Sequence, residues 1–236
     1  MAMPTTPPGY STPSTSSEPA ELAFVDTGPA PEAVIFDFGG VIITPITNKL
    51  ARIAERHGTD TTTMLEVMMG PRYESTDHPW HRAERGEVPI TDLQELVAPI
   101  AAAEGMTFQG DEYAELMDDQ TYSIVPGAIE LVGHVGDSPL RMGLLTNSVR
   151  EFRPELEAAV DLALFDAVVD SSIEGTRKPE PEIYCRATER VGVEPERILY
   201  LDDFDHNLGP ARDLGWQVVH VTDPTVAFAQ VRRLLS

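Results

Sequence analysis

The sequence predicts an α/β protein: a Rossmann-like open parallel sheet with a helical cap inserted after its first strand. After Pro126, short apolar stretches alternate with stretches of helical periodicity. The stretch Ile198–Leu201 has no polar face, which is typical of a parallel strand covered by helices on both sides. Between the first strand and this alternation, about 75 residues show helical periodicity without a convincing strand. A helical block at that position predicts a helical insertion after the first strand.

The first strand is expected at Ala33–Phe38, where an apolar run precedes the Gly39-Gly40 turn. A second short apolar run, Val41–Ile43, ends before Pro45. The helical block that follows is expected to contain the helices Asn48–His57, Thr62–Met69, His78–Arg85 and Glu112–Asp119.

One more helix of this block is expected near Thr91. Thr91 and Gln94 have the spacing of a capping box, in which each side chain binds a free N–H group of the first turn. Apolar residues between 93 and 100 then recur on one helical face. Pro99 is expected to kink this helix.

The second half of the chain predicts strands and helices in alternation. Asp223-Pro224 supplies the last helix with an N-terminal cap and a proline in its first turn. The expected helices are Ala128–Val135, Pro154–Val160, Pro181–Val191, Asn207–Leu214 and Val226–Leu235. The expected strands are Arg141–Thr146, Ala167–Asp170, Ile198–Leu201 and Gln217–Val221.

The domain organisation follows from these patterns and from composition. Residues 1–30 are rich in Pro, Ser, Thr and Gly and carry few large apolar groups, so burial cannot offset the entropy of ordering them. We therefore expect a disordered tail over residues 1–30. Residues 31–46 and 121–236 form the predicted core, and residues 47–120 form the predicted cap.

Charge and composition exclude several functional classes. Acidic residues outnumber basic ones by 39 to 17, and the net charge of -22 argues against nucleic acid or an anionic membrane as partner. We expect a cytoplasmic protein, because there is no basic start followed by an apolar run, and no apolar stretch approaches the roughly 20 residues of a membrane span. A single cysteine permits neither an intrachain disulfide nor a thiolate metal cluster. The oligomeric state stays open.

Polar side chains stand at the carboxyl ends of four of the predicted strands, where an open α/β sheet binds its ligands. They are Asp37, then Thr146-Asn147-Ser148, then Asp170-Ser171-Ser172, then Asp202-Asp203. Any one of them is a common way to end a strand and cap the next helix. Together they predict a ligand site at one edge of the sheet.

Four motifs in chain order resemble those of the haloacid dehalogenase-like hydrolase superfamily, whose members are mostly phosphatases. The resemblance runs from about Val34 to Val221 and includes a cap inserted after the first strand. Its most specific parts are the Lys-Pro-x-Pro-x-Ile-Tyr run and the paired aspartates. The motifs are Phe36-Asp37-Phe38-Gly39-Gly40-Val41, Leu145-Thr146-Asn147, Arg177-Lys178-Pro179-Glu180-Pro181-Glu182-Ile183-Tyr184 and Leu201-Asp202-Asp203.

The resemblance implies a nucleophile and a metal site. Asp37 is the expected nucleophile, which attacks phosphorus and forms an aspartyl-phosphate, so one hard displacement becomes two easier ones. Asp37, Asp202 and Asp203 form an all-oxygen ligand set that suits Mg²⁺. In the family a backbone carbonyl two residues after the nucleophile completes this set, and Gly39 can provide it. Mg²⁺ is therefore the expected cofactor.

The resemblance also implies a phosphate-binding set. Lys178, one of only two lysines in the chain, is expected to hold the phosphoryl oxygens and stabilise the transition state. The Thr146 hydroxyl and the Asn147 backbone N–H are expected to donate hydrogen bonds to the same oxygens.

Gly39 departs from the family pattern, because most phosphatases of this superfamily have there a second Asp that protonates the leaving group. Such acid–base help is typically worth about 10²–10⁴-fold. We favour a substrate with a good leaving group, such as an anomeric sugar phosphate, an acyl phosphate or a diphosphate. The chain resembles an Asp-x-Gly branch that includes a sugar-1-phosphate phosphatase, and residues 81–87 are similar to that branch.

Gly39 is also compatible with a proton donor elsewhere in the chain or with a nearly inactive site. A cap group can supply the proton, and the candidates are Thr44, Thr47, His78, His81 and Glu84. Alternatively, the site binds phosphate and barely turns over. A 2-haloacid dehalogenase also lacks the second Asp, but such enzymes work without metal and lose the acidic pair that this chain keeps at Asp202-Asp203.

The cap is expected to close over the phosphate and select the substrate. The candidate substrate-binding residues are Gly40, Arg72, Trp80, Arg82 and Arg85. In the competing interpretation, these arginines are ion-paired surface residues and Trp80 packs inside the cap.

Together these observations predict a Mg²⁺-dependent phosphomonoesterase. It would act on a small phosphorylated metabolite through phospho-Asp37. The alternative is a catalytically weak protein of the same fold with a binding or regulatory role.

Overall fold

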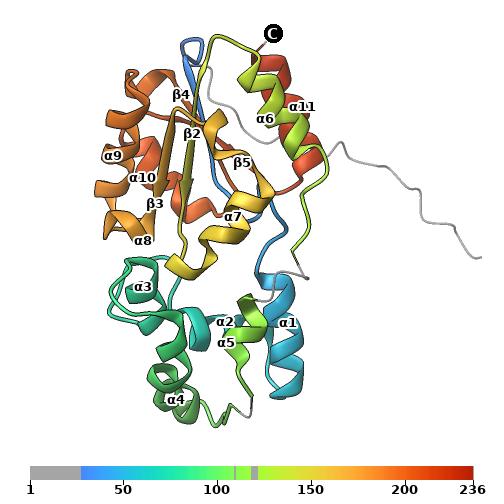
Figure 1. Cartoon of the computed structure of the whole chain (residues 1–236), viewed down its shortest axis with the longest axis vertical. Helices are drawn as coiled ribbons and strands as arrows, with labels where there is room; N and C mark the ends of the chain where they lie inside the picture. The colour runs from blue at the N-terminus through green and yellow to red at the C-terminus, as the bar shows by residue number, and fades with distance from the viewer. Residues whose placement is uncertain (1–27, 109, 118–121, 236) are drawn as a thin grey trace, which may run out of the picture.

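A computed structural model describes residues 28–108, 110–117 and 122–235 (Figure 1). Its centre is a five-stranded sheet in the order β3-β2-β1-β4-β5, with every neighbouring pair parallel. The strands are β1 Ala33–Phe36, β2 Arg141–Thr146, β3 Ala167–Asp170, β4 Ile198–Asp202 and β5 Gln217–His220. The predicted Rossmann-like parallel sheet is confirmed.

Helices cover both faces of the sheet, as Figure 1 shows. Helices α9 (Pro181–Val191) and α10 (Asp205–Asp213) pack on one face, where Ile35, Leu145 and Tyr200 point. The other face carries Val34, Phe36 and Leu144 and packs against the helices α6 Ala128–Gly136, α7 Arg153–Ala159 and α11 Pro224–Leu234. Burial on both faces explains why the strands are apolar throughout.

The last helix begins as the sequence predicts. The Asp223 carboxylate accepts hydrogen bonds from the backbone N–H groups of Thr225 and Val226, and Pro224 is the first helical residue. Asp170 has a similar role at α8 (Ser171–Glu174), where it accepts from the Ser172 backbone N–H at 3.0 Å. Asp170 is therefore a helix cap and lies outside the ligand cavity described below.

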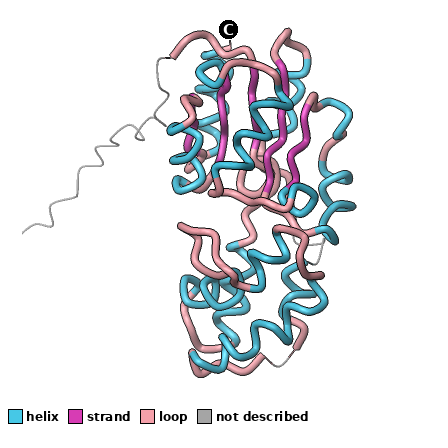
Figure 2. The backbone as a smooth tube through the Cα atoms, turned by 90° about the vertical axis from the view of Figure 1, so that its left-hand side faces the viewer, coloured by secondary structure: helices cyan, strands magenta, loops and turns pink. Residues whose placement is uncertain are grey.

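Five helices between β1 and α6 pack on one another beyond the carboxyl ends of the strands (Figure 2). They are α1 Thr47–Arg56, α2 Thr61–Met69, α3 Pro79–Glu84, α4 Leu93–Ala103 and α5 Glu112–Met117. Residues 118 and 119 of the predicted last cap helix lie outside the described residues. We refer to this helical group as the cap.

The predicted capping box at Thr91 is wrong. Thr91 lies in a 3₁₀ turn, and α4 starts without a side-chain cap, because Gln94 instead donates to the Gly110 carbonyl at 3.0 Å. At the end of the predicted tail, the Pro29 carbonyl accepts a 2.7 Å hydrogen bond from Gln217 on β5. Residues 1–27 lie outside the described residues, so the disordered tail stays a prediction. In the described part, no helix has the length and apolarity needed to cross a membrane.

Candidate active site

The sheet places Asp37 between two other functional strand ends. Phe36 on β1 pairs with Leu144 on β2 and with Leu201 on β4, and the Asp37 backbone N–H continues the ladder to the Leu201 carbonyl at 2.8 Å. Because Asp202 follows Leu201, the carboxylates of Asp37 and Asp202 meet at neighbouring strand ends. The order of the strands therefore assembles residues from distant parts of the chain.

Lys178 bridges these two carboxylates. Its Nζ lies 2.8 Å from Asp37 Oδ1 and 2.8 Å from Asp202 Oδ2, and its side chain is 1% exposed. Burial alone would lower the pKa of Lys178, but the charges of Asp202 and Asp37 outweigh it, and the pKa lies above its ordinary value. The ammonium therefore stays charged at neutral pH and fixes the Asp37 carboxylate, whose Oδ1 also accepts from the Phe38 N–H.

Asp202 is fully buried and its oxygens are occupied by protein donors. Asn207 Nδ2 lies 3.1 Å from both oxygens, and the Phe204 N–H lies 2.8 Å from Oδ1. The Tyr200 hydroxyl also donates to Asp202 Oδ2. Sequence reasoning missed Tyr200 and Asn207. Strand alternation could have indicated Tyr200, because it stands two residues before Asp202 on a buried strand and so shares its face.

Asp203 completes a carboxylate cluster that fits a metal ion. The carboxylates of Asp37, Asp202 and Asp203 offer oxygens within 4.8 Å of one another. Asp203 Oδ1 is buried and has no hydrogen-bond partner among the described residues. Burial, with a further contribution from the neighbouring Asp202 charge, raises the pKa of Asp203 to about 7. A hard cation would satisfy the oxygen and relieve the repulsion, so this oxygen donor set fits Mg²⁺.

Burial also raises the pKa of Asp37 well above its ordinary value. The Lys178 charge opposes this rise, while Asp202 and Asp203 add to it. A cation beside Asp37 would therefore favour the ionised carboxylate that a nucleophile requires.

Gly40 makes room for Asp203. Its φ is +77°, and a Cβ there would lie 2.1 Å from Asp203 Oδ2. Within the described chain, Gly40 is not among the residues that line the cavity, so the prediction that it binds substrate finds no support. Its role is to let the backbone approach the acidic pair.

We expect Gly40→Ala to displace Asp203 and to weaken Mg²⁺ binding. The left-handed backbone and the close contact should also lower the free energy of unfolding by about 1–3 kcal/mol. Urea unfolding and a Mg²⁺ titration measure the two effects. Gly39→Ala is the matched control, because a Cβ at Gly39 has no described atom within 4 Å. Equal effects of the two substitutions would contradict this role.

The strand end of β2 supports Lys178. The Asn147 side-chain amide donates to the Lys178 carbonyl at 3.0 Å and accepts from the Lys178 N–H at 2.8 Å. Thr146 lines the cavity next to it. The structure thus gives the Asn147 side chain a positioning role, while phosphate binding by its backbone N–H and by the Thr146 hydroxyl stays a prediction.

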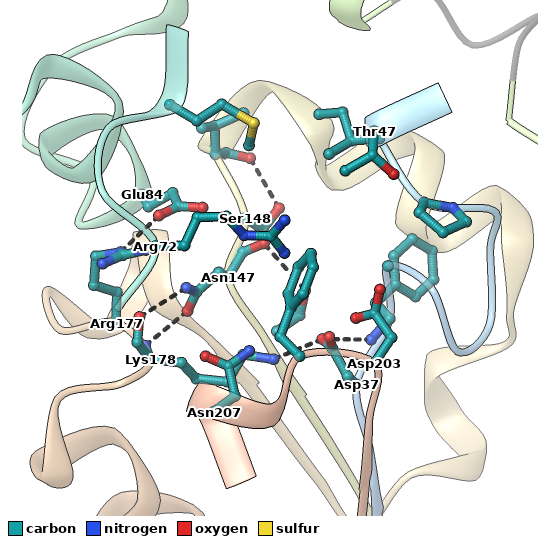
Figure 3. A pocket seen from close by; sticks show the side chains of 18 of the residues that line it. Asp37, Thr47, Arg72, Glu84, Asn147, Ser148, Arg177, Lys178, Asp203 and Asn207 are labelled. Carbon is teal, nitrogen blue, oxygen red and sulfur yellow. Dashed lines mark hydrogen bonds and ion pairs between the residues drawn. The ribbon is translucent and has the colours of Figure 1, made fainter. Parts of the chain in front are cut away.

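A cavity lies over these residues, between the sheet edge and the cap (Figure 3). Asp37, Gly39, Lys178 and Asp203 form its floor, whereas Asp202 lies beneath it, fully buried. Much of the remaining wall is apolar and consists of Phe38, Ile43, Ile46, Leu65, Met69, Met117, Val149 and Phe152.

The geometry agrees with a family comparison. A model of haloacid dehalogenase-like hydrolases matches residues 31–215. The chain belongs to this family. The match includes β1, the cap, the strand ends that carry Asp37 and Asp202, and the turn before α9 that carries Lys178.

Relatives of this hydrolase are distant. The chain is 27% identical over 207 residues to acyl-CoA dehydrogenase family member 10 of Mus musculus, covering 86% of the chain and 19% of that protein. It is 24% identical over 211 residues to the sesquiterpene phosphatase astK of Aspergillus oryzae, covering 87% and 97%. A phosphoglycolate phosphatase of Salmonella choleraesuis is 28% identical over 111 residues, covering 47% and 44%. The chain thus spans only a fifth of the mouse protein.

Solved structures share the hydrolase fold. A HAD-like family hydrolase from Porphyromonas gingivalis superposes with a TM-score of 0.63 at 18% identity, covering 88% of this chain and 98% of that one. A HAD family enzyme from Bacteroides thetaiotaomicron, in complex with magnesium and inorganic phosphate, gives 0.58 at 17% identity, covering 80% and 93%. L-2-haloacid dehalogenase from Xanthobacter autotrophicus gives 0.58 at 21% identity, covering 85% and 88%.

The cap of this HAD-like hydrolase directs only two of the predicted substrate-binding residues into the cavity. Arg72 and Trp80 line it. Arg82 pairs with Glu87 at 3.3 Å, and the Arg85 Nε lies 2.6 Å from the same carboxylate. Neither of these two arginines belongs to the cavity wall that the described residues form. The competing interpretation, a solvated and ion-paired helix residue, fits Arg82, whereas Arg85 is ion-paired but largely buried at the end of α3.

The candidate proton donors are poorly suited to replace the acid that Gly39 lacks. Glu84 lines the cavity, but its Oε2 accepts a hydrogen bond from Arg177 Nε at 2.6 Å. Burial and the Arg177 charge lower the pKa of His81 to about 3, so its ring is neutral at pH 7. His78 lies outside the cavity wall of the described residues and contacts the Val67 carbonyl.

The two threonine candidates, Thr44 and Thr47, line the cavity. A threonine hydroxyl is a weak acid with no proton to spare at neutral pH, so these side chains can donate a hydrogen bond and not a proton. The carboxylate and imidazole candidates are thus occupied or neutral.

Proposed function

We propose that this HAD-like hydrolase is a Mg²⁺-dependent phosphomonoesterase that acts through an aspartyl-phosphate on Asp37. The observation that carries the proposal is the Asp37 carboxylate itself. It stands at the floor of a cavity, is held by Lys178 at 2.8 Å, and lies beside an Asp203 oxygen that has no partner among the described residues. A carboxylate, a fixed cation and an oxygen-rich metal site are the groups that phosphoryl transfer requires.

The reaction uses the chain's own groups in two displacements. An Asp37 oxygen attacks phosphorus, and the bond to the ester oxygen breaks with its electron pair on the leaving group. Water then attacks the aspartyl-phosphate, which releases phosphate and a proton and restores the carboxylate. Lys178 holds negative charge in both steps, and Asn147 keeps Lys178 in place. Mg²⁺, when bound, neutralises charge between the carboxylates and the phosphate.

The cavity wall supports a phosphorylated metabolite with an apolar body. Side chains such as Leu65, Met69 and Phe152 offer no hydrogen-bond partners for sugar hydroxyls. The relative from Aspergillus oryzae is a sesquiterpene phosphatase by name, and this chain matches 97% of its length. We therefore favour, over the sugar 1-phosphate that the sequence suggests, a substrate with a hydrocarbon body and an equally good leaving group.

Two alternatives make different predictions. A catalytically weak binding or regulatory protein would bind phosphate without releasing it from esters. A 2-haloacid dehalogenase would release halide without metal, and the Asp203 oxygen left without a protein partner in the described chain argues for a cation there.

We expect the purified protein to release phosphate from 4-nitrophenyl phosphate or acetyl phosphate. The rate should need Mg²⁺, fall to background in EDTA, recover when excess Mg²⁺ is restored, and be inhibited by vanadate. Phosphate binding without any release would support the regulatory alternative. Halide release from 2-chloropropionate in EDTA would support the dehalogenase.

A further inference from the structure

Arg72 reaches into the cavity from the cap, and no acidic partner is found for it among the described residues. Its Cζ lies 3.2 Å from the centroid of the Phe204 ring, which covers one face of the guanidinium. Its Nη2 is buried and has no hydrogen-bond partner among residues 28–108, 110–117 and 122–235. A buried charge is costly unless it is paired, so this guanidinium indicates an anion that the chain itself does not supply. Figure 3 shows the side chain directed over the strand ends.

A second guanidinium in the same cavity also keeps a free donor. Arg177 uses Nε to pair with Glu84 at 2.6 Å, while its Nη1 is buried without a partner in the described chain. The charges of Asp203, Asp202 and Glu84 all act on Arg72, but none of these carboxylates forms an ion pair with it in the described chain. Both guanidiniums thus keep a buried N–H group without a described partner beside the phosphate site. Trp80 Nε1, which lacks a described partner too, adds a neutral donor to the wall.

Because Gly39 supplies no acid, the leaving group must depart without receiving a proton. An alcohol leaves phosphorus poorly without a proton, whereas the oxygen of a second phosphate leaves as a weak base. A second phosphate is also an anion with several acceptor oxygens, which matches planar guanidinium donors. A carboxylate elsewhere on the substrate would satisfy Arg72 but would leave the poor leaving group unchanged.

We propose that Arg72 and Arg177 form a second anion subsite that holds the leaving phosphate, so that the substrates are diphosphate monoesters with an apolar body. This inference rests on the proposed function. Asp37 attacks the terminal phosphorus, the bridging P–O bond breaks, and its electron pair stays on the organic monophosphate. Water then releases inorganic phosphate and one proton from Asp37. The guanidiniums stabilise the departing charge without transferring a proton, because arginine stays protonated.

The test compares decyl diphosphate, decyl phosphate, a carboxyalkyl phosphate and 4-nitrophenyl phosphate on the full-length protein. Wild type should show a kcat/KM for decyl diphosphate about 10²-fold above that for decyl phosphate and the carboxyalkyl phosphate. Arg72→Gln should lower the ratio of the diphosphate rate to the 4-nitrophenyl phosphate rate by about 10²-fold. Arg72 has no ion pair in the described fold, so this variant should fold.

Arg82→Gln is the matched control, because Arg82 pairs with Glu87 away from the cavity. It should leave the ratio unchanged. Equal losses on both substrates in Arg72→Gln would overturn the subsite, as would a preference for the carboxyalkyl phosphate or no preference for the diphosphate. If 4-nitrophenyl phosphate is still hydrolysed through Asp37, only the subsite is wrong. If no ester is hydrolysed, the proposed function is wrong.

Discussion

Replacing Asp37 with asparagine should lower phosphate release by at least about 10⁴-fold, because the amide cannot attack phosphorus and a nucleophile acts as a unit with its partners. The loss should appear equally with 4-nitrophenyl phosphate and with a natural substrate. Initial rates in saturating Mg²⁺ measure it. A variant that retains more than a tenth of the wild-type rate would show that another group attacks.

The same substitution should not destabilise the metal-free fold. Burial raises the pKa of Asp37 well above its ordinary value of 3.8, so the ionised form disfavours folding, increasingly as the pH rises above that value. Asparagine removes this charge, and Lys178 keeps its 2.8 Å ion pair with Asp202. Urea unfolding in EDTA at pH 7 should therefore find Asp37→Asn at least as stable as wild type. Lower stability would mean that the Lys178–Asp37 pair stabilises more than burial costs.

The sheet and its functional edge could be predicted because each depends on local pattern. Apolar strands alternating with helices define a parallel sheet, and its ligands bind at the carboxyl ends of the strands. Asp37 and Asp202 stand at such ends, so their positions in the chain were enough to place them in the predicted site. Lys178 was predicted from its motif and could not have been predicted from hydrophobic periodicity.

Contacts that depend on side-chain direction could not be predicted in this way. Arg72 and Arg82 are both basic residues of the cap, but Arg72 follows the glycine that ends α2 and reaches the cavity, whereas Arg82 lies on α3 and pairs with Glu87. The Glu84–Arg177 pair joins residues 93 positions apart. Nothing local in the sequence indicates a pair that forms only when the cap meets the core.

Gly39→Asp should raise the rate on alkyl phosphates by about 10²-fold, because it supplies the missing proton donor. The structure has room for it: Gly39 lines the cavity, and a Cβ there meets no described atom within 4 Å. The new carboxylate would join Asp37 and Asp203, and like charges nearby should raise its pKa, which suits a general acid. Rates on decyl phosphate, with 4-nitrophenyl phosphate for comparison, measure the gain.

Gly39→Asn is the control, since it has the same shape but no proton to give. The gain should be large for decyl phosphate and small for 4-nitrophenyl phosphate or decyl diphosphate, whose leaving groups need no proton. An equal gain in Gly39→Asn would assign the effect to packing. A gain on every substrate would mean that wild type lacks more than an acid. A gain confined to substrates with poor leaving groups would instead indicate that the natural substrate has a leaving group that needs no acid, which explains why Gly39 is tolerated.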